Sequence, residues 1–158
     1  MINKPFRAKK KQFDGKGEWV YGWLVELSKD SFSDEKRYGI CDKAIRVGTL
    51  SGEDVVYNLK ITEVVPHTIC EATGLCTHDI VEIWENDICE DVEGRKYVVR
   101  KEYDVPGGYW AESGFVLDEI GVSGYTHFTD MIDNWENEIQ VNVVGNIFDN
   151  PEIREAQK

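Results

Sequence analysis

Two carboxylates and an amide stand side by side at Glu85, Asn86 and Asp87, inside the segment IWENDI. If this segment were extended, Glu85 and Asp87 would point to the same side and could form a carboxylate pair of the kind that performs acid–base hydrolysis. The same residue types favour a sharp turn, because Asn readily adopts a left-handed backbone conformation and Asp accepts hydrogen bonds from nearby backbone N–H groups. The turn is the simpler interpretation, so we assign these residues a structural role and predict no catalytic residue.

The segment HTICEATGLCTH contains the imidazole and thiol groups that zinc prefers. A tetrahedral zinc site takes four such ligands, and the segment supplies His67, Cys70, Cys76 and His78. Their spacing, however, does not match the closely paired ligands of common structural zinc sites. Cysteine is also one of the most frequently buried residue types and often serves as a small hydrophobic side chain. We therefore predict no metal and no other cofactor, and keep zinc as an alternative.

Other catalytic arrangements lack a local signature. A cysteine nucleophile needs a base close by, and His67, His78 or His127 could supply one, but no spacing pairs any of them with a thiol. The glycine-rich segments DGKGE and PGGYW lack the pattern of phosphate-binding loops. The prediction is a protein that is not an enzyme, with an enzyme of unknown class as an alternative.

Short β-strands must position these residues. The segment WVYGWLVEL is rich in aromatic and β-branched residues, which is typical of a strand. Its alternate positions form two faces that both carry apolar groups, so we expect a central strand or one covered on both sides. One face consists of Trp19, Tyr21, Trp23 and Val25, and the other of Val20, Gly22, Leu24 and Glu26.

Turn residues separate many further strand-like runs, and a short helix is expected only near residues 129–136. There Thr129 can cap the first turn, and Met131 and Trp135 follow at helical spacing. The predicted fold class is therefore mainly β, a small β-barrel or roll. The expected division is an N-terminal β segment at 1–65 that could form a subdomain, a barrel domain at 66–153 and a tail at 154–158.

Charge is unevenly distributed along the 158-residue chain, whose net charge is −12. Residues 1–16 contain six Lys or Arg and one Asp, whereas residues 61–94 contain nine acidic residues and no Lys or Arg. Residues 102–153 contain eleven acidic residues and again no Lys or Arg. An acidic surface repels nucleic acids and anionic membranes, so neither is an expected partner. The basic N-terminus could bind an anion or lie against an acidic surface of its own chain or of a neighbour.

The sequence predicts a cytoplasmic protein. No apolar run approaches the roughly 18 residues of a membrane span, and the N-terminus lacks the apolar region of a secretory signal. The four cysteines are therefore expected to be reduced thiols rather than disulfides.

Two further sets of residues have a structural interpretation and a functional alternative. Asn146 and Asn150 in GNIFDNP are expected to form a turn that ends a strand, although they could lie on a functional loop. Aromatic residues are expected to fill the core, although several could form an exposed patch for a ligand or partner. The candidates for this patch are Tyr109, Trp110, Tyr125 and Trp135.

Four stretches span residues 5–153 in order, namely KPFRAKK with GKGEWVYGWLVE, then HTICEATGL, IWENDI and VNVVGNIFDNPEI. Together they resemble the YopX family of bacterial and prophage proteins. Besides the Glu85–Asp87 triplet, the positions that carry the resemblance are Phe6, Arg7, Trp19, Tyr21, Gly22, Thr73, Gly74, Leu75, Gly145, Asn146, Asn150 and Pro151.

The chain departs from the family pattern at three places. The family has Gly between the Glu and Asp of its I-(F/Y)-E-G-D-I-V motif, where this chain has Asn86, which also tolerates a left-handed backbone. The family's D-K-N-G-K loop before that motif is replaced by CTHDIVE, which changes how the turn closes. The usual Gln and aromatic residue before Thr-Gly-Leu are Glu71 and Ala72 here.

The resemblance implies a mostly β protein whose C-terminal part is an SH3-like barrel, a phage or prophage origin and a capacity for self-association. It implies no established activity. The function we predict is a non-enzymatic β module that acts through protein–protein contacts, with an unknown partner or as a homo-oligomer. The alternative is an acidic protein that imitates the charge of DNA and inhibits a host nucleic-acid-binding protein.

Overall fold

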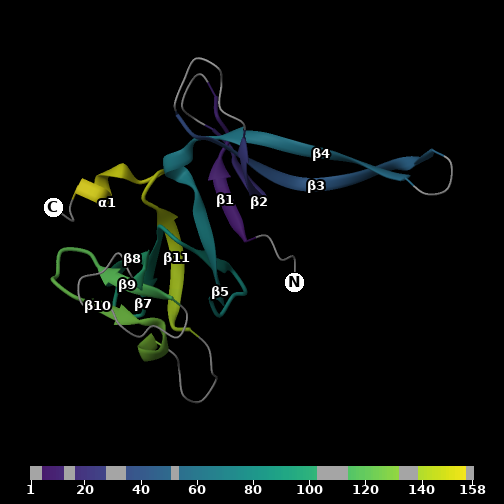
Figure 1. Ribbon diagram of the computed structural model, residues 1–158. Coiled ribbons are helices and arrows are strands. Elements are labelled where there is room, and N and C mark those ends of the chain that lie inside the picture. Colours follow the sequence, from purple (N-terminus) through teal and green to yellow (C-terminus); the bar gives the residue numbers. More distant parts are fainter. Residues whose placement is uncertain are drawn as a thin grey trace. The chain divides into compact units, whose positions relative to one another are not determined.

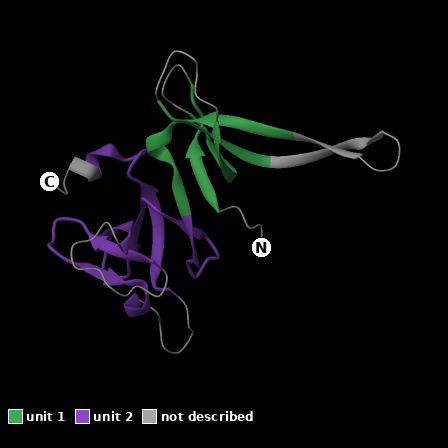
Figure 2. Cartoon of the chain, in the orientation of Figure 1, with its two compact units in different colours: residues 1–71 green, residues 72–158 purple. Residues whose placement is uncertain are grey.

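The computed structural model describes residues 5–12, 17–27, 35–50, 54–102, 114–131 and 139–155, and for residues 43–50, 54–58 and 154–155 it describes the backbone alone. The chain divides into two compact units, residues 1–71 and 72–158 (Figure 2). The sequence placed the boundary at residue 65. The structure places it later because the residues after 65 remain attached to the first unit, where Cys70 and Glu71 pair with the first strand.

Unit 1 is an antiparallel sheet in the order β4-β3-β2-β1-β5 (Figure 1). Its elements are β1 (Phe6–Lys9), β2 (Trp19–Leu27), β3 (Arg37–Leu50), β4 (Asp54–Val64), the 3-10 helix η1 (Pro66–Thr68) and the start of β5 (Cys70–Cys76). The pairing of β2 with β3 ends at Trp23 and Cys41, whereas the β3–β4 hairpin continues to the pair of Leu50 and Asp54. The hairpin is thus longer than the strand beside it.

The sheet of unit 1 curls until its first and fourth strands meet. Lys10, just after β1, forms a β-bridge with Val64 at the end of β4. Two backbone hydrogen bonds of 2.9 Å flank this bridge, from Lys11 N–H to the Glu63 carbonyl and from Val65 N–H to the Lys9 carbonyl. The curled strands enclose a core of Ala8, Ile40 and Val64, against which Phe6, Val20, Leu24, Tyr38 and Ile69 pack.

Part of the basic N-terminal segment, Phe6–Lys9, is therefore a strand of unit 1. Phe6–Lys9 lie between β2 and β5, and the Lys11 ammonium forms an ion pair with Glu63 at 2.9 Å. This ion pair joins one lysine of the basic segment to a single glutamate of the same unit.

The strand β2 is central, as its sequence predicts, with β1 on one side and β3 on the other. Its two faces differ in burial. Val20 and Leu24 pack against the core, whereas Tyr21 and Trp23 on the other face are exposed. The alternative prediction, that both faces of this strand are covered, was wrong. Apolar residue type alone does not decide whether another element covers a position.

Unit 2 contains an antiparallel five-stranded sheet in the order β10-β9-β8-β7-β11, while β6 pairs with β5. Its strands are β6 (Glu82–Trp84), β7 (Asp87–Asp91), β8 (Lys96–Lys101), β9 (Phe115–Glu119), β10 (Tyr125–His127) and β11 (Val141–Asn146). The hydrophobic core of the described part of this unit contains Ile83, Cys89, Tyr97, Val99, Phe115, Leu117, Phe128, Ile139 and Val141.

The prediction of a mainly β fold is confirmed. The five-stranded sheet is open in the part of unit 2 that the structure describes, with β10 and β11 at its edges, so the structure does not reproduce the closed SH3-like barrel that the resemblance implied for this half. Within the described ranges, no helix has the length and apolar character needed to cross a membrane.

The helices are short. The 3-10 helix η3 (Phe128–Met131) covers the beginning of the helix expected at 129–136, and residues 132–138 lie outside the described residues. The α-helix α1 spans Pro151–Glu155. The sequence predicts no helix there, but the end of the last strand followed by a tail. Proline explains the start of the helix, because its fixed φ angle suits the first helical turn, whereas the strand already ends at Asn146.

We expect the replacement Ile40→Ala to destabilise the protein by about 2–5 kcal/mol, because a fully buried Ile side chain leaves a cavity that the curled sheet cannot close. Urea unfolding measures this effect. The control Val144→Ala removes an exposed side chain and should change the free energy of unfolding by less than about 0.5 kcal/mol. Equal effects of the two replacements would contradict the assignment of this core.

Candidate functional site

The Glu85-Asn86-Asp87 segment forms the tight turn between β6 and β7. Asn86 has a φ angle of 66°, in the left-handed region, as its residue type suggested. Its N–H donates to the Val99 carbonyl at 2.8 Å, and its own carbonyl accepts the Ile147 N–H at 3.1 Å. The turn therefore connects with both β8 and the segment after β11.

The Asp87 carboxylate closes this turn from inside the protein. Asp87 is buried, and its Oδ2 accepts the Trp84 N–H at 2.9 Å. Glu85 lies in the turn itself and not in an extended strand with Asp87. The extended geometry that would direct both carboxylates to one side is thus absent from this segment.

A second turn, Ile147–Asp149, lies next to the first. The Asn146 Oδ1 accepts the N–H groups of Phe148 and Asp149, both at 3.0 Å, and the Asn146 Nδ2 donates to the Asp149 carboxylate at 2.7 Å. The Asn150 Oδ1 accepts the Asn146 N–H at 3.3 Å. Because Asn146 pairs with Asp87 across β11 and β7, the two turns are neighbours.

Gly145 leaves room for the Asn150 side chain in this packing. A Cβ atom at position 145 would lie 2.3 Å from the Asn150 Oδ1, closer than real Cβ contacts allow. The segment GNIFDNP is thus a hydrogen-bonded structural turn followed by the first residue of α1.

Thr73 joins β5 to β6. Its hydroxyl donates to the Ile83 carbonyl at 2.7 Å and accepts the Leu75 N–H at 3.1 Å. Gly74 has a φ angle of 79° at an irregularity in the pairing of these strands, and Leu75 packs against the core of unit 2. The Thr-Gly-Leu residues therefore shape a kinked strand.

The N-terminal motif residues face one another across β1 and β2. Phe6 pairs with Gly22, and Arg7 pairs with Tyr21. Arg7 is buried, and its guanidinium lies 4.6 Å from the centre of the Trp19 ring. Such a cation–π contact fixes the orientation of the indole as well as that of the arginine.

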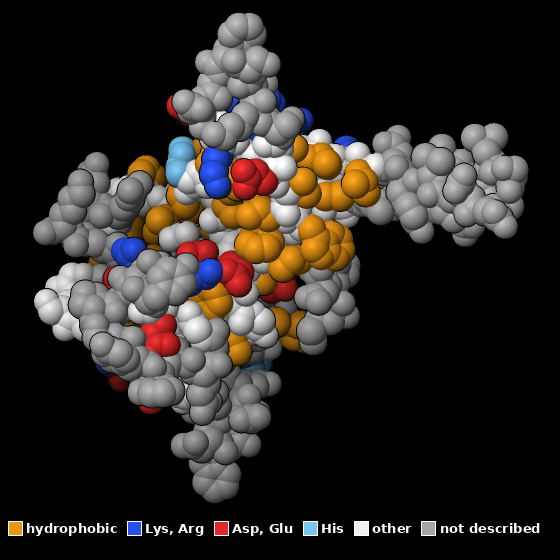
Figure 3. Space-filling view, in the orientation of Figure 1, with side chains coloured by type: hydrophobic (Ala, Val, Ile, Leu, Met, Phe, Trp, Pro, Cys, Tyr) orange, Lys and Arg blue, Asp and Glu red, His pale blue; other side chains and the backbone are white. Residues whose placement is uncertain are grey.

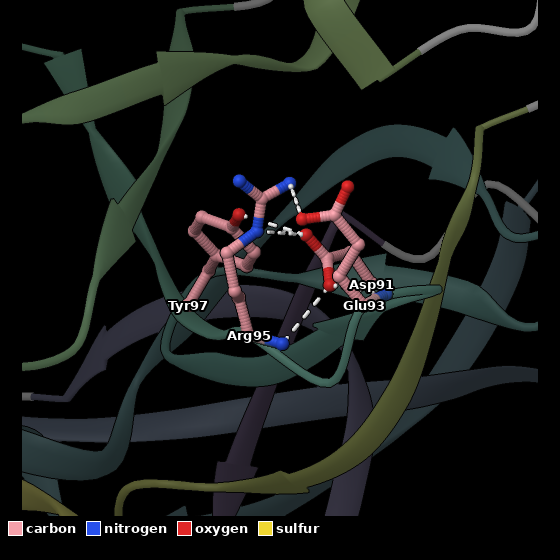
Figure 4. Close-up of polar contacts among 4 residues, drawn as sticks. All are labelled: Asp91, Glu93, Arg95 and Tyr97. Atoms are coloured by element: carbon pink, nitrogen blue, oxygen red, sulfur yellow. Dashed lines mark hydrogen bonds and ion pairs between the residues drawn. The ribbon is translucent and has the colours of Figure 1, made fainter.

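The sequence analysis missed a buried carboxylate, Asp91, at the end of β7 (Figure 4). Its Oδ2 accepts the Arg95 Nε at 2.7 Å and the Tyr97 hydroxyl at 2.9 Å. Its Oδ1 accepts the N–H groups of Glu93 and Arg95, both at 2.9 Å. The sequence EDVEGRKY indicates a turn at Gly94, but nothing in it shows that the aspartate, alone among several acids, is buried.

These contacts set the pKa values of the cluster. Burial by itself would raise the pKa of Asp91, but hydrogen bonds from Arg95, Tyr97 and Glu93 outweigh it and lower the pKa below its usual range. Burial, together with the hydrogen bond to Asp91, raises the pKa of Tyr97 to about 12. The carboxylate stays ionised and the phenol stays protonated at neutral pH, which favours a structural role for both.

The four candidate zinc ligands have separate surroundings. Cys70 is buried and its thiol donates to the Thr68 carbonyl at 3.4 Å, while Cys76 is exposed at the other end of β5. The His78 Nδ1 lies 3.3 Å from the Asp79 carboxylate, and His67 is exposed in η1. Nowhere in the described residues do three or more His, Cys, Asp or Glu side chains gather in a potential metal site.

The buried thiol of Cys89 is unreactive. Burial, and to a smaller extent the charge of Asp87, raises the pKa of Cys89 to about 12. Only the thiolate is a good nucleophile, so Cys89 is a hydrophobic core residue at neutral pH.

Apolar side chains are exposed on the face of unit 1 that points away from its core. We call this surface the Trp23 face and define it by the exposed residues Tyr21, Trp23, Leu59 and Ile61. Trp23, Cys41 and Ile61 occupy one row across β2, β3 and β4. Figure 3 shows hydrophobic side chains gathered over these strands.

Cations border the Trp23 face. The Lys9 ammonium lies 5.5 Å from the centre of the Trp19 ring. Arg37 forms a bidentate ion pair with Glu63, from Nε at 3.0 Å and Nη2 at 2.7 Å, and Lys11 binds the same carboxylate. Hydrogen bonds from Arg37 and then Lys11 lower the pKa of Glu63 to about 2. The border is thus cationic, with one carboxylate that remains ionised.

Of the four aromatic residues that the sequence suggests for an exposed patch, only Tyr125 lies in the described part of the chain. Tyr125 is half-buried, and its ring packs edge-on against His127 with 5.4 Å between the ring centres. Tyr109, Trp110 and Trp135 lie outside the described residues. The exposed aromatic residues that the structure describes are instead those of the Trp23 face.

The sequence profile of the YopX protein family matches residues 5–155, nearly the whole chain. The chain belongs to the YopX family. The solved structure of protein EF1440 from Enterococcus faecalis is similar, with 19% sequence identity, coverage of 97% of this chain and 99% of that one, and a TM-score of 0.48. No curated protein matches the chain.

The YopX motif positions have structural contacts throughout. The motif at 85–87 and the motif at 145–151 are adjacent turns, and the Thr73 motif positions the strand before them. In this YopX protein several motif residues therefore hold turns and the strand before them, whereas the exposed Trp23 face combines the motif residue Tyr21 with residues outside the motifs.

We expect Asn86→Gly to change the stability of the protein little, because Gly also adopts a positive φ angle. Asn86→Ala should destabilise it by about 1–2 kcal/mol, the approximate cost of a left-handed conformation in an ordinary L-residue. Urea unfolding of both variants gives the comparison. If Ala is tolerated as well as Gly, the φ angle of residue 86 does not constrain the turn.

The replacement Asp91→Asn should destabilise the protein by about 2–4 kcal/mol at pH 7, because the amide cannot accept all four hydrogen bonds at a buried site. The lowered pKa means that the stabilisation by Asp91 is complete above the ordinary aspartate pKa of about 4 and is lost as the pH falls through the folded-state value. The variant should therefore lose less stability between pH 5 and acid conditions than the wild type.

A matched control is Asp118→Asn. The Asp118 Oδ2 accepts Arg100 Nε at 2.8 Å, almost the same geometry, but this ion pair is half-exposed. Its loss should cost less than about 1 kcal/mol. Similar losses for the two variants, or parallel pH profiles of Asp91→Asn and wild type, would show that burial of the Asp91 network contributes nothing.

Proposed function

We propose that this YopX protein is a phage- or prophage-encoded, non-catalytic binding module that acts by assembling with further copies of itself through the Trp23 face. The observation that carries the proposal is the exposure of Tyr21, Trp23, Leu59 and Ile61 on one sheet face. Trp and Tyr are enriched at the centres of protein interfaces, where a few large side chains supply most of the binding energy.

Charge favours a second copy as the occupant of this face. Unit 1 contains 12 Lys or Arg and 11 Asp or Glu, a net charge of +1, whereas unit 2 contains 6 and 19, a net charge of −13. A cation-bordered face is attracted to an acidic surface. Each chain carries such a surface in its own second unit, so a copy of the chain supplies the complementary charge.

The polar groups inside the protein support a non-catalytic role. Asp87 and Asp91 use their oxygens to hold turns, and the Cys89 thiol is protonated at neutral pH. A catalytic acid, base or nucleophile requires a group whose proton or electron pair is available to a substrate. These buried groups are committed to internal contacts.

A second candidate function is inhibition of a basic, nucleic-acid-binding host protein by charge imitation. The net charge of −13 on unit 2 favours it. This function predicts salt-sensitive binding of basic proteins by unit 2 and no dependence on Trp23.

We expect the wild-type protein to form oligomers whose mass, measured by light scattering, falls with dilution. Trp23→Ser should raise the dissociation constant at least tenfold, since loss of a central interface Trp commonly costs about 2 kcal/mol or more. Leu59→Ser should weaken assembly in the same direction. A wild-type monomer at every concentration and salt would contradict self-assembly and leave binding of a basic host protein as the function to test.

The control for Leu59→Ser is Val122→Ser. Val122 in unit 2 is 57% exposed, close to the 51% of Leu59, but lies outside the Trp23 face. Replacement of Val122 should leave the mass of the oligomers unchanged. Equal weakening by both replacements would indicate a general effect of surface hydrophobicity.

A further inference from the structure

The turn between β5 and β6 presents an isoleucine in an unfavourable backbone conformation. Ile80 has a φ angle of 61°, and its side chain is 84% exposed. A β-branched residue rarely adopts a positive φ angle, because its Cβ substituents crowd the backbone. Neither burial nor good local geometry therefore explains this residue type at this position.

Hydrogen bonds hold Ile80 in place. Its N–H donates to the Thr77 carbonyl at 2.9 Å, and the Thr77 N–H donates to the Val81 carbonyl at 2.9 Å. The Thr77 hydroxyl also accepts the Val81 N–H at 3.2 Å. Thr77 is itself buried and forms a β-bridge with Ile139. The turn is therefore anchored to unit 2 while its tip projects into solvent.

Carboxylates flank this apolar tip. Val81, next to Ile80, is also exposed, and Asp79 and Glu82 stand on either side of the pair with exposed side chains. No Lys or Arg occurs between residues 61 and 94. We call Asp79–Glu82 the acidic tip, a small apolar surface with negative charge around it.

We infer that the acidic tip of one copy docks on the Trp23 face of the next copy. The inference rests on the proposed function and names the two surfaces that meet. Ile80 and Val81 would pack on the exposed aromatic and aliphatic side chains, and Asp79 and Glu82 would approach the cations at the border. Strained residues cluster at functional sites, so the strain at the exposed Ile80 supports a binding role for its side chain.

The charges favour this head-to-tail contact over a symmetric one. A two-fold interface places the same patch on both sides. Two Trp23 faces in contact would bring the cations around Lys9 and Arg37 of both copies together, at an electrostatic cost. Where one copy cannot make both contacts with the same neighbour, a contact between two different surfaces adds copies into rings or filaments.

Two single variants test the contributions of the two surfaces separately. Trp23→Ser damages the face and leaves the tip, whereas Ile80→Asn removes the apolar tip and leaves the face. Asn tolerates a positive φ angle, so Ile80→Asn should keep or raise the melting temperature while it weakens assembly at least tenfold. The matched control is Val92→Asn in the β7–β8 turn, an apolar residue that is 82% exposed and should be replaceable without effect on assembly.

The decisive experiment mixes the two assembly-deficient variants and measures the mass by light scattering. The intact tip of Trp23→Ser should bind the intact face of Ile80→Asn, so the mixture should form a one-to-one heterodimer although each variant alone is a monomer. No heterodimer, or full assembly by Ile80→Asn alone, would overturn the inference while loss of assembly in Trp23→Ser would still support the proposed function. A monomeric wild type would overturn both.

Discussion

The hydrogen bonds around Asn86 are the constraint on which unit 2 depends. One left-handed residue directs its N–H to Val99 in β8 and its carbonyl to Ile147 after β11, while Asp87 next to it holds Trp84 in β6. The two contacts of Asn86 connect segments that are distant in the sequence, and the contact of Asp87 closes the turn itself. A residue that could not adopt this conformation would disturb the turn and the register of its neighbours together, which explains why Gly or Asn suits the position.

The same chemistry allows a strongly acidic chain to bury aspartates. A buried carboxylate is costly unless hydrogen bonds replace its water. Asp87 and Asp91 are each at a tight turn, where backbone N–H groups converge, and Asp91 also has Arg95 and Tyr97. Most other charges remain at the surface, so the net charge affects association more than folding.

In the proposed assembly, the separation of charge between the two units would give association a direction. The cationic border of the Trp23 face and the acidic tip differ in sign but share exposed apolar side chains. Opposite charges orient such surfaces toward each other, and burial of apolar area supplies the attraction at short range. The strained Ile80 fits this view, because local preference would favour Gly, Asn or Asp at such a turn.

The sequence by itself determined the mainly β class, the central position of β2 and the turn at Asn86, because strand periodicity and left-handed preference are local properties of residue type. It also identified GNIFDNP as a turn, since Asn side chains bond to nearby backbone groups. Only the tertiary structure decided which face of β2 is covered, where the two units divide, that Asp91 is buried, and that Ile80 takes a positive φ angle. Each of these depends on which distant segments pack together, as with Lys10 and Val64 or Thr77 and Ile139, and residue type alone does not encode those pairings.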